Sequence, residues 1–147
     1  MPEYESKPLP DVVERFMRYV QIDSQSDPEH DDVTPSTPRQ HEMARYLGEE
    51  LTSLGCTDVT VDEHAYVTGT FPASPDAESA PALMLCSHLD SVIDAPAAGI
   101  KPHIVHYEGG NLVAGVVAGE KIETTPEQVP DLEKFVGMDI VCSDGTT

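Results

Sequence analysis

The sequence predicts an α/β fold with a mostly parallel or mixed sheet. Two helical patterns near the start of the chain precede a short apolar run, Ala82 to Cys86, which does not alternate and lies between loops. A run of this kind is typical of a strand that helices cover on both faces, the usual setting of parallel strands. A similar run, Met138 to Cys142, predicts a second buried strand near the end.

Two amphipathic helices are expected before the first strands. From Asp11 to Ile22 the apolar residues recur at helical spacing, and Asp23 to Thr37 has the Ser, Asp and Pro content of a loop. Ser36-Thr37-Pro38 makes a favourable opening for the second helix, and Gly55 is placed to end it. The apolar stripe of this helix consists of Met43, Ala44, Leu47, Leu51 and Leu54.

Short strands are expected after the second helix. Thr57 to Asp62 alternates and is rich in β-branched residues, and Ala65 to Phe71 is similar, so these segments predict a pair of strands. The chain from Asp90 to Gly110 is predicted to be mostly loop. Within it, Ile104 to Tyr107 is a short strand candidate, and the Gly109-Gly110 pair indicates a turn.

The end of the chain predicts a short helix, a strand and a turn. Pro130 to Val136 is the helix candidate, Gly137 ends it, and Ser143 to Thr147 begins a turn directly after the last apolar run. A domain seldom stops immediately after a core strand without a capping element. We therefore expect one domain, residues 1–147, that is incomplete at its C-terminus.

Charge and cysteine content exclude several classes of partner. Eight Lys and Arg against 27 Asp and Glu give a net charge of -19, which repels nucleic-acid phosphates and anionic membranes. No apolar run is long enough to cross a bilayer, and the acidic start does not resemble an export signal. The three cysteines are odd in number and form no C-x-x-C pair, which favours a reducing, cytoplasmic location over a disulfide framework.

The chemistry is predicted to lie just beyond the apolar run, at His88 and Asp90. Ligands of open α/β sheets gather beyond the carboxyl ends of the strands. Residues two apart in an extended segment point to the same side, so the imidazole and the carboxylate can face one cavity. A zinc-bound histidine often donates a hydrogen bond from its second ring nitrogen to a carboxylate. The spacing alone leaves open a simpler interpretation, a polar pair at the end of a strand.

Other reactive side chains have simpler interpretations. His106 lies in the Ile104 to Tyr107 strand candidate and His103 directly before it. Residues three apart on a strand point in different directions, which favours strand or loop surface positions for both. His64 and His41 are expected on exposed loop or helix surfaces, and Cys86 as a buried small hydrophobic residue.

Several short segments, in fixed order, cover nearly the whole chain. They are Arg15 to Ser26, Pro35 to Pro38, Leu54-Gly55, Ser87 to Ser91, Asp94 to Pro96, Pro102 to Val105, Tyr107 to Gly110 and Ser143 to Thr147. Several motifs in one order are more specific than any single motif. Together these segments resemble peptidase T, a tripeptide aminopeptidase among the zinc-dependent exopeptidases.

The resemblance implies a fold and a set of roles. The chain would be the N-terminal portion of a three-layer catalytic domain, without the lid or dimerisation domain. His88 would bind one of two zinc ions, and Asp90 would be catalytic. The family continues into a segment with a metal-bridging aspartate, a Glu-Glu pair, a further acidic ligand and a C-terminal histidine. This chain ends before all of them.

The implied activity is removal of the N-terminal residue from tripeptides by dizinc-assisted hydrolysis, in a cytoplasmic protein that in full length can be a homodimer. Because most of the site is missing, we expect the 147-residue chain to be inactive alone. Two other interpretations stay open at this point. One is a related dizinc deacylase or carboxypeptidase, and the other is an acidic α/β binding module without catalysis.

Overall fold

The computed structural model describes residues 11–77 and 79–143. The chain divides into two compact units. The central unit is Ile22–Ala97, and the terminal unit combines Met1–Gln21 with Ala98–Thr147. Each unit is described by itself.

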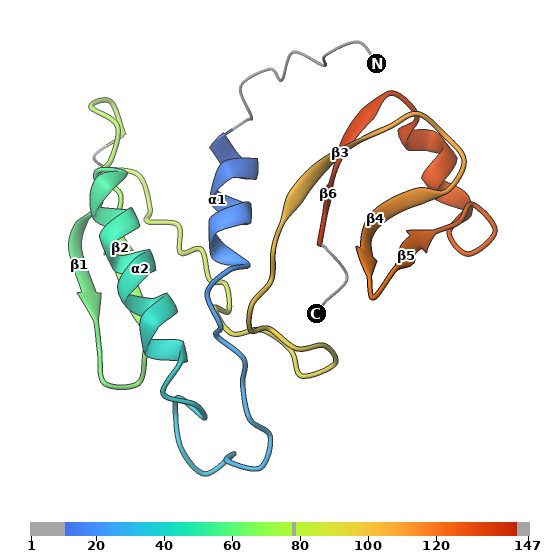
Figure 1. The fold of residues 1–147 in the computed structure, drawn as a ribbon. Helices are drawn as coiled ribbons and strands as arrows, with labels where there is room; N and C mark the ends of the chain where they lie inside the picture. The colour runs from blue at the N-terminus through green and yellow to red at the C-terminus, as the bar shows by residue number, and fades with distance from the viewer. Residues whose placement is uncertain (1–10, 78, 144–147) are drawn as a thin grey trace. The chain divides into compact units, whose positions relative to one another are not determined.

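The central unit is built from one helix and one hairpin. Helix α2, Gln40–Ser53, lies beside the antiparallel strands β1, Thr57–Val61, and β2, Val67–Thr70 (Figure 1). Glycine makes the close approach possible, because a Cβ on Gly48 would lie 2.7 Å from Val61 Cγ2. The predicted helix and strand pair are therefore confirmed.

Both ends of α2 follow local chemistry. The helix begins at Gln40, two residues after the predicted Pro38, and a turn leads into it through a 3.3 Å bond from the Gln40 N–H to the Thr37 carbonyl. At the other end Gly55 adopts a φ of 89° and donates to the Thr52 carbonyl at 3.0 Å. The Cys56 N–H donates to the Leu51 carbonyl at 3.0 Å, which completes a Schellman motif.

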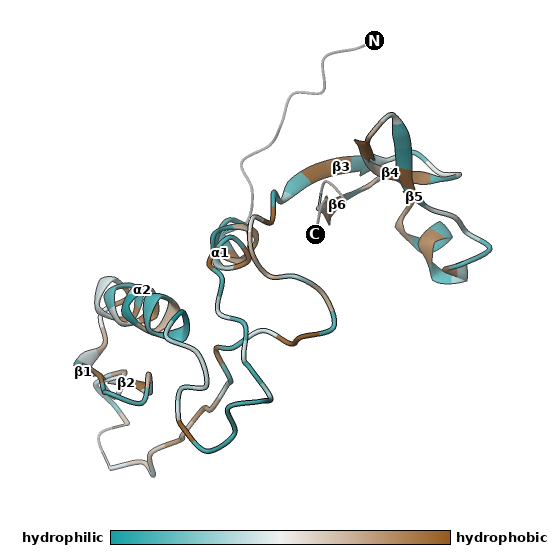
Figure 2. Cartoon of the chain, turned by 60° about the horizontal axis from the view of Figure 1, so that its bottom comes forward, coloured by the Kyte–Doolittle hydropathy of each residue, from teal (hydrophilic) through white to brown (hydrophobic). Residues whose placement is uncertain are grey.

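The terminal unit holds an α-helix, a 3-10 helix and two strand pairs, and four of its side chains form a small core. Tyr107, Leu112, Leu132 and Cys142 are buried together. Figure 2 shows the middle of β3 as hydrophobic. Val105 there is partly buried against this core, and the buried Tyr107 lies at the end of the strand. The elements are α1 (Asp11–Tyr19), β3 (His103–Tyr107), β4 (Leu112–Val117), β5 (Glu120–Thr124), the 3-10 helix η1 (Pro130–Phe135) and β6 (Met138–Cys142).

The β4–β5 hairpin was not predicted from the sequence. Ala118 and Gly119 connect the two strands, with positive φ values of 53° and 89°. Positive φ at both residues of a two-residue loop matches the right-handed twist of the strands. Gly115 interrupts the β-branched pattern of β4, so the sequence signal for this strand was weak.

The predicted buried strand Ala82 to Cys86 is wrong for this structure. The segment has no strand assignment, and Leu83, Met84 and Leu85 are 84–87% exposed. A strand is stable only when neighbours pair with its backbone and cover its side chains, and no described residue does so here.

The predicted parallel sheet and three-layer architecture are likewise not seen. The described residues form a mixed α/β structure with three separate two-stranded antiparallel sheets. Their parallel pairing is limited to an isolated bridge between Gln25 and Ser91. The predicted turn Ser143 to Thr147 lies outside the described residues except for Ser143.

Near the end of the chain the predicted helix is present as η1, and the predicted strand as β6. β6 pairs with β3, and its burial increases toward Cys142 while Met138 and Asp139 stay exposed. In the described part of the chain, no helix has the length and apolar character needed to cross a membrane.

Candidate functional site

His88 and Asp90 lie close together on an extended loop of the central unit. The His88 Nδ1 atom is 2.8 Å from the Asp90 carbonyl oxygen and 3.2 Å from Asp90 Oδ1. The His88 side chain is 77% exposed and that of Asp90 40%. The structure therefore brings the two predicted site residues together, and it leaves both accessible to solvent.

The contact determines which imidazole nitrogen is available. With its proton on Nδ1, the ring of His88 donates to Asp90, and the lone pair of Nε2 is left for another partner. No described residue forms a hydrogen bond or ion pair with that nitrogen. This is the arrangement in which a histidine binds a metal through one nitrogen and is oriented through the other.

The donors present fit only one part of a zinc site. Zinc takes four ligands, of which three or four come from the protein. Nowhere in residues 11–77 and 79–143 do three or more His, Cys, Asp or Glu side chains gather in a way that could hold a metal ion. His88 and Asp90 can supply one ligand and its orienting group, and they cannot complete a zinc centre by themselves.

The chain directly after Asp90 is attached to the loop that precedes α2. The Ser91 N–H donates to the Ser24 carbonyl, and the Ser91 carbonyl accepts from the Ser26 N–H, both at 3.2 Å. Ser91 Oγ is buried without a hydrogen-bond partner among the described residues. The attachment was not predicted, because two loops that are distant in sequence carry no periodic signal of their pairing.

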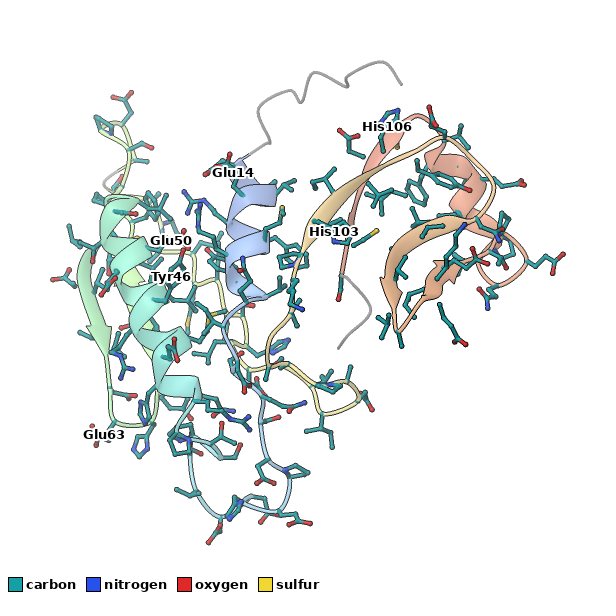
Figure 3. All side chains as sticks on the ribbon, in the orientation of Figure 1. Glu14, Tyr46, Glu50, Glu63, His103 and His106 are labelled. Carbon is teal, nitrogen blue, oxygen red and sulfur yellow. The ribbon has the colours of Figure 1, made fainter. Side chains whose placement is uncertain are left out.

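The other histidines do not join this site. Figure 3 shows His103 and His106 on β3, separated along the strand. His106 Nδ1 lies 2.7 Å from Asp139 Oδ1 across the β3–β6 pair, and His103 Nδ1 lies 3.4 Å from the Lys101 carbonyl. His64 Nδ1 contacts the Thr34 carbonyl at 3.1 Å.

Comparison with known proteins finds close sequence relatives. No family model matches the chain. Curated proteins named Peptidase T match it at 40% identity over 139 residues in Aliivibrio fischeri, 37% over 138 residues in a Geobacillus species and 37% over 140 residues in Bacillus velezensis. The matches cover 93–95% of this chain. Over nearly its whole length, the chain is therefore similar in sequence to peptidase T.

The chain spans about one third, 33%, of the length of these peptidase T relatives. A match of 93–95% of the chain necessarily includes its middle, so His88 and Asp90 lie within the segment shared with peptidase T. The resemblance stated from the motifs is therefore confirmed.

A further His–Asp contact, between His30 and Asp27, was not predicted. Asp27 accepts hydrogen bonds from the Glu29 N–H at 2.9 Å and from His30 Nδ1 at 2.8 Å. The Glu29 bond first, and His30 second, lower the pKa of the Asp27 carboxyl. The bond from Asp27 to the N–H two residues later is typical of an Asx turn, so we interpret the Asp27–His30 contact as part of the loop structure.

The three cysteines differ in exposure. Cys56 and Cys142 are buried, and burial raises the pKa of the Cys142 thiol. Cys86, two residues before His88, is exposed, which corrects the expectation that it is buried. The reason is the missing strand: without neighbours, the apolar run leaves its last residue in solvent.

Proposed function

We propose that this chain belongs to a peptidase and supplies one metal ligand, His88, together with the carboxylate that orients it, Asp90. The observation that carries the proposal is the Nδ1 contact of His88 with Asp90, which leaves Nε2 open, in a segment shared with peptidase T. The activity proposed for the whole protein is that of a zinc-dependent aminopeptidase, which removes the N-terminal residue of tripeptides.

Each residue has a defined part in this proposal. The carbonyl oxygen and Oδ1 of Asp90 accept hydrogen bonds from the Nδ1–H group of His88. These bonds hold the imidazole in one tautomer and limit rotation of the ring. The open Nε2 then presents its lone pair in a constant direction. A bound zinc ion supplies Lewis-acid polarisation of the peptide carbonyl in hydrolysis.

The remaining ligands are proposed to come from the part of peptidase T that this chain does not span. One imidazole is far short of the protein ligands that zinc requires. The 147-residue chain alone is therefore expected to bind zinc weakly and to leave tripeptides intact. A cytoplasmic location is part of the proposal, because three free thiols suit a reducing compartment.

The test is a chimera in which this chain replaces the matching third of the Aliivibrio fischeri peptidase T. We expect the chimera to release the N-terminal residue from tripeptides and to lose that activity on treatment with a chelator. His88→Ala should abolish the activity, and Asp90→Asn should reduce kcat/KM about 10–100-fold, the range for partners that orient a metal ligand. Mass spectrometry of the products gives the rate and the bond that is cleaved.

The control is His64→Ala, which removes an exposed histidine outside the site and should leave the rate unchanged. Release of the C-terminal residue instead would identify a carboxypeptidase, and cleavage of N-acyl amino acids a deacylase. A folded chimera that cleaves none of these substrates would refute the enzymatic proposal and support a binding module.

A further inference from the structure

We infer that Gln25 is a positioning residue for the His88–Asp90 pair. Its side-chain amide donates two hydrogen bonds, to the Val92 carbonyl and to the Ala95 carbonyl, both at 2.9 Å. These partners are 67 and 70 positions away in sequence. One side chain thus fastens the turn that follows the histidine and aspartate to a distant loop of the same unit.

The backbone around Gln25 holds the same turn from its other end. Gln25 forms a parallel bridge with Ser91, through the Ser24 carbonyl and the Ser26 N–H. The Ser26 hydroxyl adds a 3.3 Å bond to the Ser91 carbonyl. Asp90 is therefore one peptide bond away from a segment that is attached at both of its ends.

Gln25 is itself fixed to the start of α2. Its carbonyl accepts a 2.8 Å bond from the Thr37 hydroxyl, and its N–H donates to Asp23 Oδ1 at 3.1 Å. The other oxygen of Asp23 pairs with Arg39 Nη1 at 2.6 Å. Thr37 is buried, so these contacts join Gln25 to the folded part of the unit.

The His88–Asp90 pair needs contacts of this kind, which fix its position relative to the rest of the unit. The contact between His88 and Asp90 joins two exposed side chains of one loop, so it depends on the conformation that this loop keeps around Asp90. It does not fix them relative to the rest of the unit, and the preceding residues Leu83 to Leu85 are exposed and unpaired with any described strand. The hydrogen bonds of Gln25 and its neighbours to the segment after Asp90 fix that position.

The direct test is Gln25→Met in the 147-residue chain, since Met keeps the length of the side chain and removes both N–H donors. We expect the amide protons of Ser26 and Ser91 to exchange with solvent about tenfold faster. The imidazole nitrogens of His88, followed by NMR, should change from one tautomer to a mixture. The signals of α2 and of the β1–β2 pair should stay in place, which separates loss of position from loss of fold.

Gln21→Met is the matched control, because the amide of Gln21 donates only to the Met17 carbonyl within its own helical turn. The control should leave the His88 signals unchanged. Should Gln25→Met unfold the chain, the unaltered protein still decides the question. The side-chain amide protons of Gln25 must then exchange more slowly than those of Gln21, and equal rates overturn the inference. An unchanged His88 spectrum in a folded Gln25→Met variant also overturns it.

The role toward a metal rests on the proposed function, and the two can fail separately. Zinc added to the unaltered chain should shift the Nε2 signal of His88. The same addition should shift it less in Gln25→Met. No shift at any zinc concentration contradicts the metal-binding proposal and leaves the tautomer result as the test of positioning. An equal zinc response in both proteins contradicts the positioning role.

Discussion

At the scale of single residues, the site depends on short polar contacts, and the sequence revealed only part of them. The spacing of His88 and Asp90 predicts that both face one side of an extended segment and leaves open whether they touch; in the structure they are in contact. The role of Gln25 could not be predicted in this way. Its partners are carbonyl groups 67 and 70 positions away, and a backbone carbonyl has no signature in the sequence.

Asp27 gives a pH prediction at this scale. Its pKa is lowered from 3.8, first by the Glu29 N–H and then by the His30 side chain. When folding lowers the pKa of a carboxyl, the ionised group stabilises the folded loop at pH values above the pKa of the unfolded chain. This stabilisation is lost as the pH falls through the lower pKa of the folded state. We therefore expect the contacts of Asp27 to be intact at neutral pH and to be lost below pH 3.8.

Carbon-13 NMR of the side-chain carboxyl measures this titration directly. His30→Ala should raise the midpoint only part of the way toward 3.8, because the Glu29 N–H is the larger cause. A midpoint at or above 3.8 in the unaltered chain would show that the Asx turn is not formed in solution.

At the scale of the elements, helices and strands were predicted correctly where the sequence contains both a periodic apolar pattern and residues that mark its ends. Helix α2 shows an apolar stripe and a terminal glycine, and its hairpin shows β-branched strands, so all three elements were predictable. The β4–β5 hairpin was missed because Gly115 breaks its pattern. The run Ala82 to Cys86 was misassigned because composition indicates a buried strand without showing whether neighbours are present to bury it.

Gly55 carries a prediction about the end of α2. Its φ of 89° is unfavourable for any residue with a Cβ, although a Cβ there would meet nothing within 4 Å. Gly55→Ala should therefore lower the free energy of unfolding by about 1 kcal/mol through backbone strain alone. Urea denaturation followed by circular dichroism measures the change.

Ser53→Ala is the matched control, because Ser53 is exposed in the last turn and bonds only to Glu50 within the helix. Its effect should be near zero, since alanine is a good helix former. Equal effects of the two substitutions would show that the Schellman turn does not hold the helix end.

At the scale of the whole molecule, burial is modest and an apolar segment is left in solvent. Leu83, Met84 and Leu85 are more than four-fifths exposed in the central unit. Consecutive exposed apolar residues favour association, while a net charge of -19 opposes it by repulsion between copies. The balance between the two should depend on salt, because salt screens the repulsion and leaves the apolar attraction.

We expect the chain to stay monomeric at low ionic strength and to self-associate as salt is added. Sedimentation velocity over a series of salt concentrations measures the effect. The double variant Leu83→Ser and Leu85→Ser should remain monomeric throughout. Val116→Ser, which removes a single exposed apolar residue at another position, should associate like the unaltered chain. Association that salt does not change would point to a different cause.

The parallel bridge between Gln25 and Ser91 also has a kinetic consequence. Bringing these residues together closes a loop of about 65 residues, at an entropic cost on the order of 4 kcal/mol. That cost falls when α2 and the β1–β2 pair, which both lie inside the loop, have already shortened it. During folding, the imidazole of His88 should therefore acquire its final orientation late, after the secondary structure between the two bridge residues has formed.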